Sequence, residues 1–309
     1  MKMAWLEPVR GEFRERLESG RLAHALLLSG PAGTGKLGLA LELAAGLLCQ
    51  QGIWPACGKC RSCELMTSGA HPDYRRLSFE LNAKGNMRTE IVIEQVRKLI
   101  SSLQLTTTIS ARKVAILHPA EAMNRNAANA LLKTLEEPPG DTVMILVSDD
   151  PGRLPATIRS RCQNLHVRLP ETRLALEWLM ENGDYDPLEA ESALQAAARS
   201  PLRARDMLND GSTAHYSLVS STLDDMLRGR CGPGQAVAAL ADVNPGQLWT
   251  WLSLCAAEKI RRNIEVKRSA KLFAQLQFTA DRNRSLLSTQ VRKDLLLQDW
   301  LIQWAQIRV

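Results

Sequence analysis

The sequence has no run of about 18 uncharged apolar residues, which is the least that a membrane-spanning helix requires. Its N-terminus, Met-Lys-Met-Ala-Trp-Leu-Glu-Pro, lacks the apolar core of a secretory signal. Neither an internal repeat nor a low-complexity tract is present. These absences exclude a membrane span and a secreted product, so we expect a cytoplasmic protein.

The surplus of basic residues is moderate. Lys plus Arg number 39 and Asp plus Glu number 33, which gives a net charge of +6. This surplus is compatible with a nucleic-acid partner, although many basic proteins bind none. Apolar residues make up 45% and charged residues 23% of the 309 residues, as in globular proteins. At roughly 100–200 residues per domain, a chain of this length has two or three domains.

Four of the seven cysteines are clustered, with the spacing C-x₇-C-x₂-C-x₂-C; they are Cys49, Cys57, Cys60 and Cys63. In a cytoplasmic protein, four thiolates this close favour a closed, tetrahedral structural Zn²⁺ site over disulfides. An iron–sulfur cluster is an alternative, but its fourth cysteine usually lies downstream beside a proline, and none does here. Four ordinary free thiols are the remaining alternative. The isolated cysteines, Cys162, Cys231 and Cys255, are typical of small buried residues.

Apolar runs and amphipathic stretches alternate through residues 1–168. The runs typical of buried strands are residues 24–30, 113–118 and 142–148. The stretches typical of helices are residues 36–49, 91–103 and 126–137, the last ended by two prolines and a glycine. This alternation predicts an α/β domain with a parallel sheet covered by helices on both faces.

The rest of the chain has no clear strand pattern. Residues 169–209 predict a small domain of short helices, and residues 210–309 predict an all-α bundle that includes the amphipathic stretches 246–262 and 286–307. We therefore expect three domains, with boundaries near residues 168 and 209.

A glycine-rich loop joins the first predicted strand to the first predicted helix. Its pattern, G-x-x-x-x-G-K, runs from Gly30 to Lys36. In such a loop the backbone N–H groups and the helix dipole hold phosphate, and the lysine reaches the β- and γ-phosphates. The predicted phosphate-binding residues are Gly30, Gly33, Thr34, Gly35 and Lys36. The alternative is a glycine turn followed by an incidental lysine.

Two groups needed for Mg²⁺-dependent hydrolysis are missing. The Ser or Thr expected after the lysine is Leu37, so its hydroxyl ligand is lost. The acids expected after the second strand are replaced by His118 and Pro119, and Glu121 follows a few residues late. Two losses in one site predict a degenerate site with no Mg²⁺-dependent hydrolysis, and leave weak ATP or ADP binding open.

Four features together carry a resemblance to a known family. They are the degenerate phosphate loop, the four-cysteine insert after its helix, "NAANALLKTLEEPP" (126–139) and "LPATIRSRCQ" (154–163). In these features the chain resembles the bacterial clamp loaders, which are AAA+ proteins. The resemblance covers residues 1–210 and implies an AAA+ domain (1–168), a helical lid (169–209) and a helical collar (210–309) for oligomerisation.

The resemblance implies roles for particular residues. The four clustered cysteines match the zinc ligands of the family. Ser160 and Arg161 match a Ser-Arg-Cys motif whose arginine reaches in trans into the ATP site of a neighbouring subunit. From its spacing alone, Arg161 would be a surface or salt-bridging arginine. Ser148 matches the polar residue that senses the γ-phosphate. A second sensing arginine falls at Leu202 by register, with Arg203 one residue later.

The resemblance also implies a function. The chain would be a non-hydrolysing subunit of a hetero-oligomeric clamp loader, part of the DNA-directed DNA polymerase (nucleotidyltransferase) holoenzyme at the replisome on the nucleoid. Its partners would be the gamma/tau ATPase subunits, the clamp-opening delta subunit and, through the complex, the sliding clamp and primed DNA. Two rival functions are an independent ATPase, such as a helicase loader, and a standalone DNA-binding protein.

Three further features have ordinary structural interpretations. Residues 259–284 are rich in Lys and Arg, which is typical of a solvated helix face, with DNA contact as the alternative. The tryptophans of the last domain, Trp249, Trp251, Trp300 and Trp304, are expected to pack between helices rather than stack on bases. His71 is expected to be structural, because four cysteines already complete the metal site.

Overall fold

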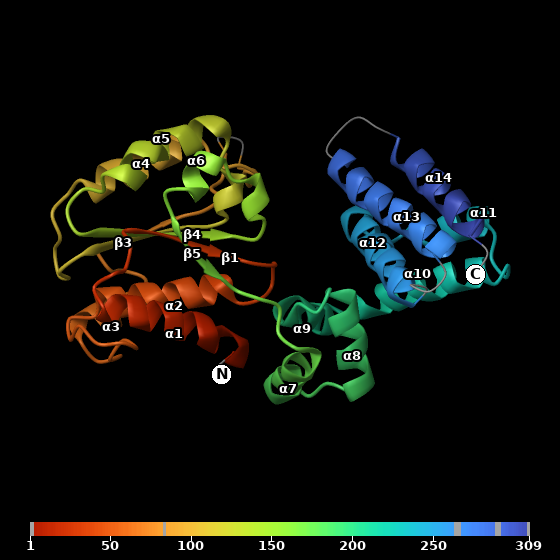
Figure 1. Cartoon of the computed structure of the whole chain (residues 1–309), viewed down its shortest axis with the longest axis horizontal. Helices are drawn as coiled ribbons and strands as arrows, with labels where there is room; N and C mark the ends of the chain where they lie inside the picture. The colour runs from red at the N-terminus through yellow and green to blue at the C-terminus, as the bar shows by residue number, and fades with distance from the viewer. Residues whose placement is uncertain (1–2, 83–84, 263–266, 288–291, 308–309) are drawn as a thin grey trace. The chain divides into compact units, whose positions relative to one another are not determined.

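The computed structural model describes residues 3–82, 85–262, 267–287 and 292–307 (Figure 1). These residues form two compact units, Met1–Leu174 and Ala175–Val309. Within the described residues, no helix is both long enough and apolar enough to cross a membrane. The α/β fold expected for the N-terminal part and the helical fold expected for the rest correspond to these two units.

The first unit is built on a five-stranded parallel sheet with the order β2-β3-β4-β1-β5. The strands are β1 (Ala25–Ser29), β2 (Tyr74–Leu77), β3 (Lys113–Leu117), β4 (Thr142–Ser148) and β5 (Gln163–His166). Every residue of β1, β3 and β4 is buried, which confirms the three strands predicted from apolar runs. The edge strands β2 and β5 were not predicted, because their sequences are short and mostly polar.

Helices cover both faces of the sheet (Figure 1). One face carries α1 (Glu7–Glu18), α2 (Lys36–Leu48) and α3 (Arg61–Thr67). The other face carries α4 (Ile93–Leu103), α5 (Arg125–Glu136) and α6 (Ala156–Arg159). Short 3₁₀ helices, η1 (Ala4–Leu6), η2 (Ala120–Ala122) and η3 (Pro151–Arg153), connect these elements. The predicted arrangement of helices on both faces of a parallel sheet is therefore confirmed.

The core between the sheet and the second helix layer is apolar and almost fully buried. Leu131 and Leu135 of α5 and Leu103 of α4 have at most 1% of their surface exposed. They pack in one cluster with side chains of β1, β3 and β4. Helix α5 begins where the Asn124 side chain accepts a hydrogen bond from the backbone of Ala127 (2.9 Å). This packing fixes the end of α5, which lies close to α6 and to the candidate arginine site.

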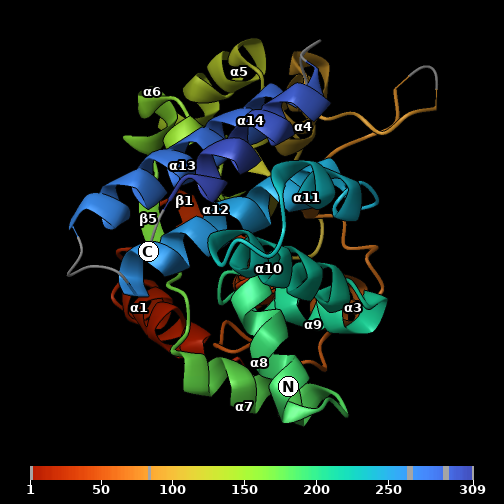
Figure 2. The same cartoon turned by 90° about the vertical axis from the view of Figure 1, so that its right-hand side faces the viewer.

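The described part of the second unit is entirely helical. Its helices are α7 (Thr172–Asn182, which starts just before the unit boundary), α8 (Pro187–Ala196), α9 (Pro201–Asp210), α10 (Thr213–Leu227), α11 (Pro233–Ala239), α12 (Pro245–Arg262), α13 (Lys267–Leu286) and α14 (Lys293–Ala305). Helices α12 and α13 lie side by side (Figure 2). Ala198 and Arg199 have positive φ angles of 53° and 64°, so α8 and α9 are separate helices. A further division of this unit into a lid and a collar stays a prediction.

The tryptophans of the second unit pack between helices, as predicted. Trp249, Trp251, Trp300 and Trp304 are each at most 2% exposed. The rings of Trp300 and Trp304 stack with 5.2 Å between centroids, and the Trp300 indole N–H donates to the carbonyl of Leu276 on α13 (2.9 Å). Buried rings whose N–H groups are satisfied internally stabilise the helical unit and offer no platform for bases.

The basic stretch 259–284 falls on α12 and α13, and residues 263–266 within it lie outside the described residues. Lys259 pairs with Asp224 of α10 (2.6 Å). Arg261, Arg268, Lys271 and Arg282 are exposed. Part of the stretch therefore serves packing between helices, and contact of the exposed part with DNA stays a prediction.

Candidate functional site

The glycine loop adopts the strand–loop–helix geometry predicted from its sequence. It leaves β1 after Ser29 and enters α2 at Lys36. Gly30, Gly33 and Gly35 have positive φ angles of 145°, 73° and 90°, a region that other residues seldom occupy. A Cβ atom at Gly30 would lie 2.1 Å from the carbonyl oxygen of Val167, so only glycine fits there. The loop has the form of a phosphate loop, and phosphate binding by it stays a prediction.

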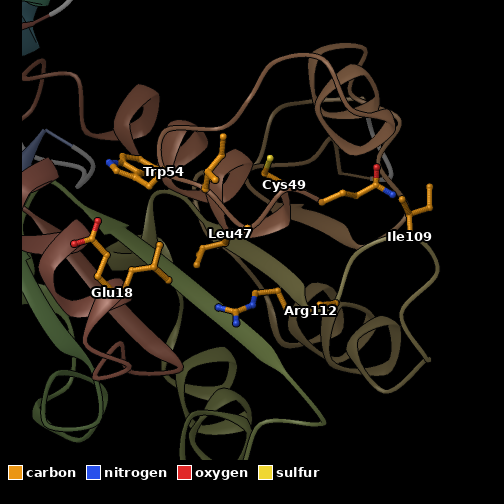
Figure 3. A pocket seen from close by; sticks show the side chains of 12 residues that line it. Glu18, Leu47, Cys49, Trp54, Ile109 and Arg112 are labelled. Carbon is orange, nitrogen blue, oxygen red and sulfur yellow. The ribbon is translucent and has the colours of Figure 1, made fainter.

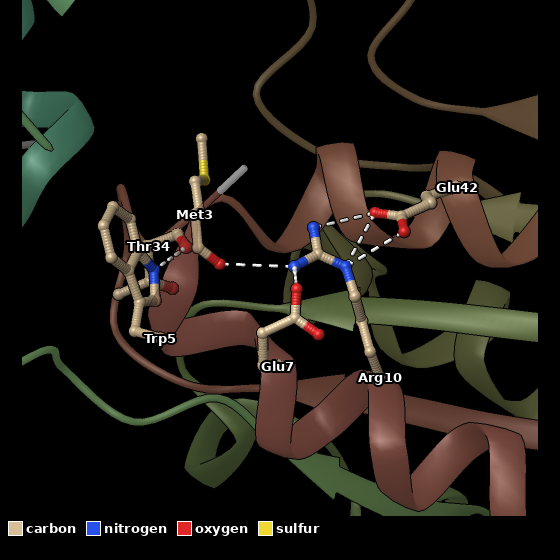
Figure 4. Close-up of polar contacts among 6 residues, drawn as sticks. All are labelled: Met3, Trp5, Glu7, Arg10, Thr34 and Glu42. Atoms are coloured by element: carbon tan, nitrogen blue, oxygen red, sulfur yellow. Dashed lines mark hydrogen bonds and ion pairs between the residues drawn. The ribbon is translucent and has the colours of Figure 1, made fainter. Parts of the chain in front are cut away.

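The N-terminal residues lie directly against this loop (Figure 4). The indole N–H of Trp5 donates to the carbonyl oxygen of Thr34 (2.9 Å). A Cβ atom at Gly35 would lie 2.4 Å from the sulfur of Met3. Arg10 of α1 donates to the carbonyl of Met3 (3.2 Å) and, through Nε and Nη2, to the carboxylate of Glu42 on α2 (2.9–3.0 Å). The segment 3–6 is thus bound to the loop, which the sequence analysis did not anticipate.

Lys36 is buried, with 3% of its side chain exposed. Its ammonium group contacts the carbonyl oxygen of Pro31 (2.5 Å) and the Oδ1 atom of Asp149 (2.7 Å). Asp149 directly follows β4, the strand that pairs with β1. The lysine expected to reach phosphate therefore meets a carboxylate of its own chain.

His118, which replaces one of the expected acids, lies near this ion pair. Burial lowers the pKa of His118, with Arg76 and Lys36 acting in the same direction and Asp149 and Glu121 against it. The imidazole is therefore neutral at neutral pH. It offers no carboxylate for Mg²⁺, and Leu37 offers no hydroxyl. Loss of the Mg²⁺ site stays a prediction.

Ser148 and Glu121 each carry a buried side-chain oxygen that has no hydrogen-bond partner in the described part of the chain. The Ser148 hydroxyl is fully buried, and no hydrogen-bond partner for it lies among the described residues. The same holds for Oε2 of Glu121, whose other oxygen accepts the backbone N–H of Asp149 (3.0 Å). Ser148 therefore stands at the end of β4 beside the ion pair, and its predicted role in sensing phosphate is compatible with this place.

Arg161 lies just after α6 and is held by its own chain. Its Nε donates to Oε1 of Glu136, at the end of α5 (2.6 Å), and its Nη2 contacts the same oxygen. Its Nη1 donates to the carbonyl of Thr157 (3.0 Å), which also accepts the Ser160 hydroxyl (3.2 Å). The Arg161 side chain remains 33% exposed. Arg161 is therefore a salt-bridging arginine in this chain, and its role in trans stays a prediction.

The structure brings the four predicted metal ligands together. The Sγ atoms of Cys49, Cys57, Cys60 and Cys63 all lie within 4.8 Å of one another. Cys49 follows the end of α2, Cys60 caps α3, and Cys63 lies in its first turn. Two Sγ–Sγ distances are 3.5 Å and 3.9 Å. A tetrahedron with Zn–S bonds of about 2.3 Å requires about 3.8 Å between sulfurs, so the cluster fits a metal such as zinc.

The thiols of this cluster differ in acidity. Hydrogen bonds from the backbone N–H groups of Lys59 and Cys60 lower the pKa of Cys57 to about 6. Burial raises the pKa of Cys63 to about 12. Because a metal binds the thiolates, its binding would release protons, including that of the Cys63 thiol at neutral pH.

His71 stands outside the cysteine group and has a structural role, as expected. Its Nε2 lies 2.8 Å from the Ser62 hydroxyl, and its Nδ1 accepts the backbone N–H of Asp73 (3.0 Å). The Ser62 hydroxyl also lies 2.7 Å from the carbonyl of Leu48, at the end of α2. Burial lowers the pKa of His71, so its ring is neutral. This network fastens α3 and its cysteines to α2.

A cavity of ≈ 790 Å³ lies beside the cysteine cluster (Figure 3). Its walls include Leu47 and Cys49 at the end of α2, Trp54 of the insert, and Ile109 and Arg112 ahead of β3. In a parallel sheet all strands begin on one side and end on the other, so the start of β3 lies on the side opposite to the end of β1. The cavity is therefore separate from the phosphate loop.

Comparison with known proteins identifies the family. The sequence model described as "DNA polymerase III, delta subunit" matches residues 6–171. Subunit delta' of DNA polymerase III from Pseudomonas aeruginosa is 38% identical over 290 residues, which cover 92% of this chain and 85% of that protein. The Escherichia coli subunit delta' is 37% identical over 198 residues, which cover 64% of this chain and 58% of that protein. A tau subunit from Salmonella typhimurium is 32% identical over 254 residues, 79% of this chain and 38% of that protein.

The fold and the loop define the class of protein first: a P-loop-type α/β domain followed by a helical unit. Within that class the chain belongs to the family of the DNA polymerase III delta-prime subunit. The resemblance stated from sequence is thereby confirmed at the level of the family.

Proposed function

We propose that this chain is the non-hydrolysing delta-prime subunit of a bacterial clamp loader, which acts in DNA replication. The observation that carries the proposal is a contrast between two sites. The chain's own loop lacks both Mg²⁺ ligands and holds Lys36 in an internal ion pair, whereas Arg161 stands partly exposed beside α6. Membership of the delta-prime family supports this interpretation, in which the chain's own loop does not hydrolyse ATP and Arg161 acts at the ATP site of a neighbouring subunit.

The chemistry of Arg161 suits a role in trans. Phosphoryl transfer spreads negative charge over the γ-phosphate oxygens, and an arginine from an adjacent subunit stabilises that charge. Glu136 and Thr157 fix the orientation of the guanidinium in the free chain. In the complex, the guanidinium would turn part of its N–H groups toward the ATP of a gamma/tau subunit. Hydrolysis there would be coupled to opening of the sliding clamp by delta and its release on primed DNA.

The helical unit supplies the remaining proposed parts. Helices α7–α9 would form the lid and α10–α14 the collar through which the subunits assemble. In the proposed lid, Leu202 is half-buried and Arg203 is exposed, so Arg203 is the better placed of the two to approach a phosphate. The four cysteines would hold a structural Zn²⁺ with no open position for substrate.

Reconstitution with the cognate gamma/tau, delta and clamp proteins tests the arginine directly. Arg161→Ala should strongly reduce the ATPase stimulated by primed DNA and clamp, because an arginine finger contributes about 10³–10⁵ in rate at its site. Assembly and zinc content should not change. Arg159→Ala is the matched control, since Arg159 is an exposed arginine at the end of α6, two residues before Arg161. Unchanged ATPase activity in the Arg161 variant would show that Arg161 is not an arginine finger.

The two rival functions make different predictions for the isolated chain. An independent ATPase would show turnover above that of a Lys36→Ala variant, which would overturn the proposal. A standalone DNA-binding protein would bind DNA tightly and with a steep dependence on salt. We expect neither from the purified chain.

A further inference from the structure

The occupant of the phosphate loop can be inferred from the contacts of Lys36. The Lys36 side chain is 3% exposed, and its ammonium group meets oxygens of three residues of its own chain. These are the carbonyl of Pro31 (2.5 Å), the hydroxyl of Thr34 (3.5 Å) and the carboxylate of Asp149 (2.7 Å). A buried ammonium is costly unless a negative charge lies beside it, and Asp149 supplies that charge.

Asp149 is held in position by the neighbouring acid. Its backbone N–H donates to Oε1 of Glu121 (3.0 Å), and it is the first residue after β4. Because β4 pairs with β1 in register up to Ser29 and Ser148, the residue after β4 faces the start of the glycine loop. The carboxylate thus reaches Lys36 from a rigid strand end. His118 adds no positive charge at neutral pH, because burial lowers its pKa.

We propose that Asp149 is an internal anion that occupies the phosphate position of this loop and excludes nucleotide. The inference goes beyond the proposed function, because it concerns the chain's own loop and not the site of a neighbour. An incoming polyphosphate must break the Lys36–Asp149 pair and then lie against the displaced carboxylate. The polyphosphate would also have to fit beside Met3 and Trp5, which contact the loop at Gly35 and Thr34. The loop is therefore kept in its folded shape by a side chain and needs no ATP.

Binding of Mg²⁺-free ADP and of inorganic tripolyphosphate to the purified chain tests this inference. We expect negligible binding to the wild-type chain in isothermal titration at low salt. Asp149→Asn keeps the shape of the side chain and removes its charge, so it should bind both probes at least about tenfold more tightly. Asp150→Asn is the matched control, because Asp150 is the adjacent acid and its carboxylate accepts the Gly152 N–H in a tight turn (3.2 Å).

The gain must depend on the released lysine. In the double variant Lys36→Met with Asp149→Asn, the tighter binding should disappear. The inference is overturned if Asp149→Asn binds the probes no better than wild type, or if wild type already binds them as tightly as the variant. It is also overturned if the double variant retains the gain.

A stability measurement covers the case in which Asp149→Asn folds poorly. Asparagine leaves the buried ammonium of Lys36 without its counter-charge, so this variant should melt below wild type. If the ion pair is the reason, the double variant with Lys36→Met should melt above Asp149→Asn. A double variant that melts lower still would show that the two side chains act independently, against the inference.

Discussion

Arg161 and Lys36 are both paired with carboxylates, but the surroundings of the two pairs differ. Lys36 is 3% exposed and its partner Asp149 39%, whereas Arg161 and Glu136 are 33% and 49% exposed. Solvent screens an exposed pair, and such pairs contribute about 0–1 kcal/mol. Glu136 can therefore hold Arg161 in one orientation and still release it to a phosphate. At Lys36 only the carboxylate partner is exposed, so the buried ammonium lacks this freedom.

This difference predicts a small coupling energy between Glu136 and Arg161. A double-mutant cycle with Glu136→Gln and Arg161→Met, followed by chemical denaturation, should give at most about 1 kcal/mol. Because glutamine has nearly the same shape as glutamate, the packing at the end of α5 should stay unchanged. A coupling of about 3 kcal/mol or more would mean that Glu136 locks the arginine, and would argue against its use in trans.

At the scale of elements, Asp73 fastens the turn that precedes β3. Its carboxylate accepts the backbone N–H groups of Thr108 (2.7 Å), Ile109 (2.8 Å) and Ser110 (2.8 Å). Burial alone would raise the pKa of Asp73, but these hydrogen bonds, with Ser110 foremost, outweigh it and hold the pKa below its usual range. Ser110 in turn contacts Leu48 and His71, so the turn connects β2, β3 and the cysteine module.

The depressed pKa sets the pH at which this fastening is lost. Because the folded-state pKa lies below the unfolded value of about 3.9, the contribution is present above about pH 4 and disappears as the pH falls through the folded value. Asp73→Asn should cost about 2–3 kcal/mol at pH 7, since the amide cannot accept all three N–H groups. Its unfolding free energy should also vary less with pH below 4 than that of wild type.

Denaturation curves of both chains between pH 2.5 and pH 7 check this prediction. Asp141→Asn is a suitable control, because Asp141 is an exposed acid that pairs with Arg112 and lies in a nearby loop. A loss of stability in the control equal to that of Asp73→Asn would contradict the role assigned to the three backbone hydrogen bonds.

The elements also show which parts of the site sequence reasoning could reach. The strands β1, β3 and β4, the glycine loop and the four cysteines were predicted because each leaves a local pattern: an apolar run, a fixed glycine spacing, a thiol spacing. Asp149 and Glu136 leave no such pattern. Asp149 meets Lys36, 113 positions away, only because β4 lies next to β1 in the sheet. The order of the strands in the sheet brings the two residues together, and neither local sequence predicts that order.

At the scale of the whole molecule, the two compact units draw stability from separate sources. The apolar cluster of the first unit lies entirely within residues 25–158. The tryptophans of the second unit lie on α12 and α14 and contact α10 and α13 of the same unit. The cysteine cluster belongs to the first unit, where Ser62 and His71 connect it to the end of α2. Loss of a metal from the four cysteines should therefore destabilise one unit and leave the other intact.

Zinc chelation followed by hydrogen exchange with mass spectrometry tests this separation. A metal present at about 1,000 times its Kd adds about 4 kcal/mol, which corresponds to about 10 °C in the melting temperature of a unit this size. On chelation, amides in residues 49–110 should lose protection, and amides in α10–α14 should not change. Cys60→Ser should reproduce the effect without a chelator, whereas Cys231→Ser, a change in the helical unit, should not. Equal loss of protection in both units would show that the metal stabilises the chain as a single cooperative body, and would contradict a cysteine module that acts only on the sheet unit.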